Sequence, residues 1–240
     1  MRGVFFIVGP TATGKSQLAA DVARDLNADV VSVDAFQIYR GLELLTAKPD
    51  ATTLAKAPHH LIGTMSIHEE MNAEKFRREA LRAIEGIQAK NKPAIVVGGS
   101  GLYIKALTHG LGRDWKKVDI DLAGVFVSRD RDELYARINQ RVEAMFENGV
   151  IEEVKNAGAM SATAAKMIGV REIKETLEGK MPILQCVAQI QQATRQYAKR
   201  QLTWFRHQTN FEPLNLSPLS HGETVKWISQ RARRAFAEQG

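Results

Sequence analysis

The feature that most limits what this chain can fold into is a glycine-rich segment close to its first residues. The segment, Gly9-Pro10-Thr11-Ala12-Thr13-Gly14-Lys15-Ser16, has the G-x-x-x-x-G-K-[ST] spacing of a phosphate-binding loop, or P-loop. An apolar run over residues 4–8 precedes it, and a helical pattern over residues 16–26 follows it. A strand, a glycine loop and a helix in this order are the context that the motif requires. The sequence therefore predicts a diphosphate or triphosphate site at residues 9–16.

The residue types of this loop suit phosphate chemistry. Its glycines let backbone N–H groups turn towards phosphate oxygens, and the N-terminus of the next helix adds partial positive charge. Lys15 can neutralise the terminal phosphates, and the Ser16 hydroxyl can be a ligand of Mg²⁺. The residues expected to contact the phosphates are Gly9, Thr11, Ala12, Thr13, Gly14, Lys15 and Ser16. Such a loop does not tell which compound binds, so kinases, ATPases and transferases all stay open.

Short β-branched runs alternate with longer helical patterns in the first half of the chain. The runs cover residues 4–8, 30–33, 94–97 and 124–127. Their alternation with helices predicts a parallel sheet with crossover helices on both faces. After residue 127 only helical patterns follow, at residues 132–147, 151–157, 164–178 and 183–208, and we expect no further strand. The predicted fold class is α/β: a P-loop NTPase-like parallel sheet flanked by helices, followed by a helical C-terminal half.

This change of pattern divides the chain into two predicted parts. Residues 1–128 form a P-loop α/β core, and residues 129–240 form a helical C-terminal region that packs on the core and contributes to substrate binding. The clearest candidate junction is the loop at residues 109–121, which contains two glycines and the pair Lys116-Lys117.

Composition indicates the setting in which the chain works. With 1 cysteine, Cys186, it can form no internal disulfide. The first apolar run is too short for a signal peptide, and no run reaches the roughly 18 residues of a membrane span. We therefore expect a cytoplasmic protein without membrane contact, and a monomer. From Cys186 to Gly240 there are 8 Lys and Arg but 3 Asp and Glu, which predicts a polyanionic partner at that end.

Five sequence blocks, in the same order along the chain, resemble one enzyme family. They lie at residues 31–41, 46–49, 58–61, 97–103 and 197–205. Together with the P-loop they make the chain similar to the tRNA dimethylallyltransferases, from about Val4 to Arg206. The resemblance implies transfer of a dimethylallyl group from dimethylallyl diphosphate to the N6 amine of an adenine next to the tRNA anticodon. It implies tRNA and dimethylallyl diphosphate as partners, with Mg²⁺ at the phosphates.

Two features depart from the family pattern. The family usually carries a helical insertion after the block at residues 97–103, which helps to grip the tRNA, whereas this chain has the short loop at residues 109–121. In addition, Leu45 and Ser100 stand where the family usually has glycine and threonine. Ser100 keeps the hydroxyl, so we expect the chemistry to survive.

The expected reaction assigns roles to several side chains. The adenine amine is a poor nucleophile, so a base must take its proton, and Asp34 is the candidate, as the resemblance also implies. Alternatively, Asp34 orders Mg²⁺ or a loop amide. A cation must neutralise the leaving diphosphate, and the resemblance favours Arg131, with Arg129 as the alternative. Thr13 and Ser100 resemble residues at the donor site, although Ser100 is also placed to cap a helix.

Other residues are candidates for the acceptor. The Gln37 amide matches the N6 and N7 edge of adenine. On the helix at residues 183–208 one face carries Ile190, Tyr197 and Trp204, which we interpret as core. The roughly opposite face is basic and free to meet phosphates. The predicted acceptor and tRNA residues are Gln37, Arg40, Arg195, Lys199 and Arg206. His59 and His60 are interpreted as structural.

Three other functions stay open at this point. A transferase acting on free adenine nucleotides would suit a chain without the tRNA-gripping insertion. A small-molecule kinase would use the same P-loop but ignore dimethylallyl diphosphate. A nucleotide-binding module without turnover would bind phosphates and need no base.

Overall fold

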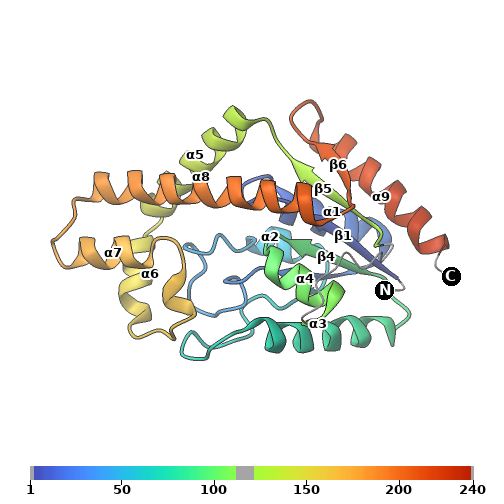
Figure 1. The fold of residues 1–240 in the computed structure, drawn as a ribbon, viewed down its shortest axis with the longest axis horizontal. Helices are drawn as coiled ribbons and strands as arrows, with labels where there is room; N and C mark the ends of the chain where they lie inside the picture. The colour runs from blue at the N-terminus through green and yellow to red at the C-terminus, as the bar shows by residue number, and fades with distance from the viewer. Residues whose placement is uncertain (1–2, 112–121, 239–240) are drawn as a thin grey trace.

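A single parallel sheet forms the centre of the protein in the computed structural model, which describes residues 3–111 and 122–238 (Figure 1). Its strands are β1 (Val4–Val8), β2 (Asp29–Val33), β3 (His59–His60), β4 (Ala94–Gly98), β5 (Gly124–Ser128) and β6 (Glu212–Asn215). Their order in the sheet is β3-β2-β4-β1-β5-β6, and every pairing is parallel. The predicted α/β fold class and the four predicted strands are therefore confirmed.

Helices connect the strands and form most of the C-terminal half. Those between the strands are α1 (Lys15–Leu26), α2 (Ala51–Leu54), α3 (Ala73–Gln88) and α4 (Gly101–His109). After β5 come α5 (Arg131–Glu147), α6 (Val150–Ala157), a short 3₁₀ turn (Ala164–Lys166), α7 (Val170–Leu177), the long α8 (Ile183–Gln208) and α9 (His221–Glu238). No described helix has both the length and the apolar character needed to cross a membrane.

Two hydrophobic clusters cover the two faces of the sheet. Successive residues of a strand point to opposite faces, so Phe6 of β1 belongs to one cluster and Phe5 to the other. The Phe5 face packs against α1 and α9, through residues such as Leu18 and Ile228. The Phe6 face packs against α3, α4 and α8, and Phe76 of α3 is fully buried there. The expectation of helices on both faces is confirmed.

Two of the expectations for the chain after residue 127 are wrong. A sixth strand, β6, follows residue 127 and pairs with β5, with Val125 opposite Glu212. Its sequence, Glu-Pro-Leu-Asn, is an exposed edge with one partly buried residue, so it lacks the apolar signal on which strand prediction depends. The helical pattern at residues 164–178 is also interrupted, because the 3₁₀ turn ends at Lys166 and α7 begins only after Gly169, which has a φ of +100°.

These corrections bear on the two predicted parts of the chain. β6 and α9 come from residues 129–240, yet both return to the sheet of the N-terminal core. The division at residue 128 stays a prediction. Most of the predicted junction loop, including Lys116 and Lys117, lies outside the described residues.

The carboxyl ends of the strands meet at one edge of the sheet, as expected for ligand binding in parallel α/β folds. The P-loop follows β1, Asp34 follows β2, and Arg129 follows β5. The strand ends approach so closely that β4 must end in glycine, because a Cβ on Gly98 would lie 2.0 Å from the Val33 carbonyl oxygen.

We predict that Gly98→Ala destabilises the protein by about 2 kcal/mol, since the clash is with backbone that cannot move without disturbing β2. Urea unfolding followed by circular dichroism measures the effect. The matched control is Gly86→Ala in α3, where the added methyl meets nothing within 4 Å. That change should stabilise the protein by about 0.5–1 kcal/mol, because alanine favours the helix. Equal effects of the two substitutions would contradict the close approach at Gly98.

Candidate active site

A polar cavity of about 600 Å³ lies at the carboxyl ends of the strands, and we call it the phosphate cavity. Part of its wall is the P-loop, through Thr11, Ala12, Gly14, Lys15 and Ser16. Asp34 and Gln37 contribute from the segment after β2, and Arg137 and Arg141 contribute from α5. The cavity therefore combines backbone N–H groups, the ammonium groups of Lys15 and Lys48 and two guanidinium groups in one concave site.

The P-loop backbone is held in shape by arginines of the C-terminal half. Arg137 Nε donates to the Ala12 carbonyl oxygen at 2.9 Å, and Arg129 Nε donates to that of Thr13 at 3.0 Å. Ala12 has a φ of +64°, a conformation that a residue with a side chain rarely adopts. We conclude that α5 and the residue after β5 stabilise the strained backbone of the P-loop.

Two P-loop residues that were predicted to contact the phosphates, Gly9 and Thr13, face other parts of the protein. The Thr13 side chain is fully buried and its hydroxyl donates to the Pro10 carbonyl oxygen at 3.0 Å. A Cβ on Gly9 would lie 2.2 Å from the Val127 carbonyl oxygen, so Gly9 serves the close contact with β5. Neither residue lines the phosphate cavity. Their role in phosphate contact stays a prediction.

Lys15 is a charged group whose pKa is strongly affected by burial in the site. Its Nζ donates to the Pro10 carbonyl oxygen at 2.9 Å. Burial lowers the pKa of Lys15 to about 8; the Asp34 carboxylate opposes this shift and the Arg141 guanidinium adds to it. An anion placed in the cavity would restore the favourable surroundings of a charged lysine.

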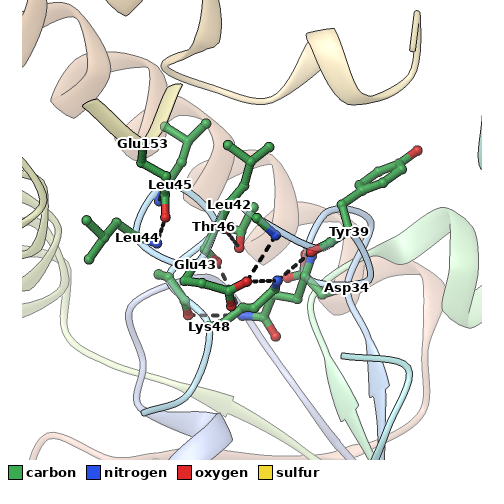
Figure 2. A network of polar contacts seen from close by, with 12 residues as sticks. Asp34, Tyr39, Leu42, Glu43, Leu44, Leu45, Thr46, Lys48 and Glu153 are labelled. Carbon is green, nitrogen blue, oxygen red and sulfur yellow. Dashed lines mark hydrogen bonds and ion pairs between the residues drawn. The ribbon is translucent and has the colours of Figure 1, made fainter. Parts of the chain in front are cut away.

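Asp34 is fixed in orientation by its own turn. Its Oδ1 accepts the backbone N–H groups of Phe36 at 2.9 Å and Gln37 at 3.2 Å. All hydrogen bonds described for this carboxylate reach Oδ1, so Oδ2 is the oxygen left to act on a substrate. Figure 2 shows the Asp34 turn beside the loop of residues 42–48.

A second cavity of about 260 Å³ adjoins the first, and we call it the apolar cavity. The two share Thr11, Asp34, Thr46, Ala47 and Arg141. The rest of its wall is largely apolar and aromatic, including Phe36, Leu45, Met145, Phe146, Ile190 and Tyr197. A polar cavity and an apolar cavity thus meet at one carboxylate, Asp34.

The structure distributes the candidate arginines differently from the prediction. Arg131 is exposed, lies over the Tyr135 ring at 5.2 Å and lines neither cavity. Arg129 donates to the P-loop and pairs with Glu133 at 2.6 Å. Arg141 lines both cavities, and its Nε is buried without a described hydrogen-bond partner. Sequence reasoning missed Arg137 and Arg141, although their spacing of four residues on a helix indicates a shared face.

The other predicted catalytic and acceptor residues divide into two groups. Gln37 lines the phosphate cavity, but its amide donates to the carbonyl oxygens of Thr46 and Ala47, so it holds a loop. Ser100 is buried at the N-cap of α4 with no side-chain cap bond and lines neither cavity. Arg40 is exposed and donates to the Thr64 carbonyl oxygen. The roles assigned to these three residues stay predictions.

The three basic residues predicted on α8 lie in different surroundings. Arg195 donates to Asn139 Oδ1 at 2.6 Å and therefore faces α5. Lys199 lines a shallow groove of about 460 Å³ together with Arg200 and Trp204. Arg206 is exposed. Tyr197, interpreted as core, is half-buried and borders the apolar cavity.

One residue of α8 joins the P-loop to the loop after β4. Gln201 is buried, its Oε1 accepts the Thr11 N–H at 2.9 Å, and its Nε2 donates to the Gly99 carbonyl oxygen at 2.8 Å. A Cβ on Gly99 would lie 2.3 Å from Gln201 Nε2, and one on Gly101 would lie 2.5 Å from the Trp204 ring. Two blocks that are far apart in the sequence, at residues 97–103 and 197–205, therefore pack directly on each other.

Oxygen ligands for a hard cation are present but sparse. The described residues contain no group of three or more His, Cys, Asp and Glu side chains that could hold a metal by themselves. Ser16 and Asp34 both line the phosphate cavity. A hydroxyl and a carboxylate beside a diphosphate fit Mg²⁺, which typically takes one or two protein ligands plus phosphate oxygens.

The lowered pKa of Lys15 predicts a pH effect on phosphate binding. A bound diphosphate favours the charged lysine and raises its pKa, so binding above about pH 8 requires proton uptake. We expect the Kd of an alkyl diphosphate, fully ionised in this range, to rise about tenfold between roughly pH 7 and pH 9. Isothermal titration calorimetry measures it. Lys15→Arg should show no such rise, and a flat profile in the parent would contradict the prediction.

The two arginines on α5 predict a second contrast. Arg141→Ala should weaken alkyl diphosphate binding about tenfold or more, since charge-assisted hydrogen bonds contribute roughly 1.5–3 kcal/mol. Arg131→Ala, which removes an exposed side chain from the same helix, should change the Kd less than about twofold. The same calorimetric titration measures both Kd values. A larger loss of affinity in Arg131→Ala than in Arg141→Ala would favour Arg131 as the phosphate contact.

Comparison with known proteins agrees with this geometry. The family "IPP transferase" matches residues 37–123 and 112–208. The tRNA dimethylallyltransferase of Oenococcus oeni is 39% identical over 221 residues, covering 85% of each chain. The tRNA dimethylallyltransferase 1 of Citrifermentans bemidjiense is 34% identical over 270 residues, covering 84% of this chain and 88% of the relative. That alignment is longer than this chain of 240 residues, so the relative carries residues without a counterpart here.

A solved structure is similar over nearly the whole fold. The full-length tRNA isopentenylpyrophosphate transferase of Bacillus halodurans superposes with a TM-score of 0.89 at 26% identity, covering 98% of this chain and 97% of that one. Sequence and structure therefore agree with the resemblance read from the five blocks, and the chain belongs to the IPP transferase family.

Proposed function

We propose that this chain transfers a dimethylallyl group from dimethylallyl diphosphate to the N6 amine of an adenine next to the anticodon of tRNA, with release of diphosphate. The observation that carries the proposal is the position of Asp34, where a phosphate cavity meets an apolar one. A base at this junction lies between a bound diphosphate and an acceptor. The relatives named tRNA dimethylallyltransferases support the same activity.

The donor diphosphate occupies the phosphate cavity in this proposal. Its charge is met by Lys15 and by Arg137 and Arg141, which border the cavity from two different elements. Neutralising charge on the leaving diphosphate lowers the barrier, because that charge grows as the bond to carbon breaks. Mg²⁺, held by the Ser16 hydroxyl with the phosphates, would add further positive charge there.

The allylic chain and the adenine occupy the apolar cavity. Its side chains, Phe36 and Tyr197 among them, exclude water that would otherwise compete for the allylic carbon. The adenine nitrogen forms a bond to that carbon while the bond from carbon to diphosphate oxygen breaks. Asp34 Oδ2 accepts the proton released from the amine. The turn that binds Oδ1 keeps this oxygen in place.

The acceptor RNA meets the protein outside these cavities. Arg200 borders both the apolar cavity and the groove that contains Lys199 and Trp204. RNA entering the apolar cavity therefore passes an exposed basic stretch of α8, and its phosphates favour such a surface. We propose further that the chain works as a monomer in the cytoplasm and that residues 129–240 supply this RNA-binding part.

We predict that the parent protein prenylates an anticodon stem-loop in the presence of dimethylallyl diphosphate and Mg²⁺, and that Asp34→Asn lowers kcat about 10²-fold or more. Asparagine keeps an oxygen for the two backbone N–H groups but cannot accept the proton. Donor affinity should change little, because the phosphates are held by other groups. Mass spectrometry of the digested RNA measures the product, and calorimetry measures donor binding.

The arms of this experiment separate the alternatives. AMP replaces the stem-loop in one arm, and ATP replaces dimethylallyl diphosphate in another. Rapid prenylation of AMP with no product on the stem-loop would establish a free-nucleotide enzyme instead. Phosphate transfer from ATP, with the allylic donor ignored, would establish a kinase. Parental turnover by Asp34→Asn would show that another group is the base.

A further inference from the structure

A carboxylate from the C-terminal half binds the loop that separates the two cavities. Glu153 of α6 accepts the backbone N–H of Leu44 through Oε1 and that of Leu45 through Oε2, both at 2.8 Å. Figure 2 shows the Glu153 side chain directed at these two consecutive groups. Short bonds from N–H groups to a carboxylate are charge-assisted and stronger than neutral ones.

The bound loop, residues 42–48, forms walls of both cavities. Thr46 and Ala47 line the phosphate cavity and the apolar cavity alike. Leu45, where the family usually has glycine, is buried and lines the apolar cavity. Any shift of this loop therefore changes the space in which the two reactants meet.

The conformation of the loop is not one that it would hold without support. Ala47 has a φ of +48°, which is unfavourable for a residue with a side chain. The Thr46 hydroxyl donates to the Leu42 carbonyl oxygen at 2.5 Å, and Gln37 Nε2 donates to that of Ala47 at 3.1 Å. Lys48 Nζ donates to the Tyr39 carbonyl oxygen and to Glu43.

These other bonds all arise from nearby sequence. Every described polar contact of the loop, apart from those of Glu153, comes from residues 37–48 (Figure 2). Such contacts tie the loop to the segment after β2, and the buried side chains of Leu42 and Leu45 add apolar packing. Glu153 is more than 100 residues away in sequence and joins the loop to α6.

We propose that Glu153 is a positioning residue for the transfer reaction, because its two carboxylate oxygens bind the backbone N–H groups of residues 44 and 45. It touches no reactant and acts by fixing Thr46 and Ala47 between the cavities. The carboxylate matters because each of its oxygens accepts one N–H group, whereas a glutamine in the same position would turn its NH₂ group, which is a donor, towards one of the two N–H groups. The transfer activity itself rests on the proposed function above.

The expected signature is a loss of turnover with little loss of donor affinity. The diphosphate is held by the P-loop and by arginines of α5, none of which contacts Glu153. Displacement of the loop instead disturbs the alignment of acceptor and allylic carbon, and small misplacements of this kind cost rates heavily. We expect Glu153→Gln to lower kcat at least about tenfold and to change donor Kd less than about threefold.

The experiment uses a matched neighbour as its control. Glu152 is exposed on the same helix, and its described contact is a 3.5 Å ion pair with Lys155. Glu152→Gln therefore makes the same chemical change without touching the loop and should retain parental kcat. Glu153→Asp keeps two acceptor oxygens and should lose less than Glu153→Gln. All four proteins are assayed on the stem-loop, and donor Kd and thermal midpoints are recorded.

Hydrogen exchange gives a readout that does not depend on activity. The amides of Leu44 and Leu45 should exchange at least about tenfold faster in Glu153→Gln than in the parent or in Glu152→Gln. Unchanged exchange would show that Glu153 does not protect these two N–H groups. Faster exchange with parental kcat, or a kcat loss that follows the thermal midpoint alone, would overturn the positioning role. Absence of transfer by the parent would refute the proposed function, while the exchange arm still decides whether Glu153 holds the loop.

Discussion

The site depends on one buried amide. Gln201 of α8 receives the Thr11 N–H from the P-loop and donates to the Gly99 carbonyl oxygen of the loop after β4. Because an amide offers one acceptor and one donor group, it satisfies two buried backbone groups of opposite kind at once. Through this contact the long C-terminal helix is joined to the strand ends, and the apolar cavity lies between them. The glycine at residue 99 follows from it, since a larger residue would exclude the amide.

The site also concentrates positive charge at some energetic cost. Lys15 and Arg141 each have a pKa lowered by burial, and the Asp34 carboxylate partly opposes the shift of both. Arg137 adds a further cation at the wall of the phosphate cavity, where Lys48 and Asp50 also lie. Such a cluster is suited to a ligand with several negative charges, because a diphosphate neutralises the positive charge that Asp34 alone leaves uncompensated. In the proposed reaction, the same charge distribution places the base next to the departing diphosphate.

The parts predictable from sequence were those whose signal is local. The P-loop, the strands around it and the position of Asp34 follow from apolar runs and glycine spacing within short segments. The sequence pointed to Arg131, whereas Arg141 is the arginine of α5 that lines both cavities, because which turn of a helix faces a cavity depends on packing against α8 and not on the motif. Gln201 and Glu153 escaped for a related reason: a polar residue in a helical pattern looks like surface until its distant partner is known. β6 escaped because its exposed residues carry no hydrophobic periodicity.

The pairing of β6 with β5 has a consequence for how the protein is made. The outer edge of β5 is completed by residues 212–215, which leave the ribosome more than 80 residues after β5 itself. Until then the nascent sheet has an open edge, the kind of surface on which chains pair with one another and aggregate. Long-range parallel pairing is also slow to form. The last quarter of the chain therefore protects the first half during synthesis, and a prematurely terminated polypeptide exposes a strand edge instead of forming a smaller version of the enzyme.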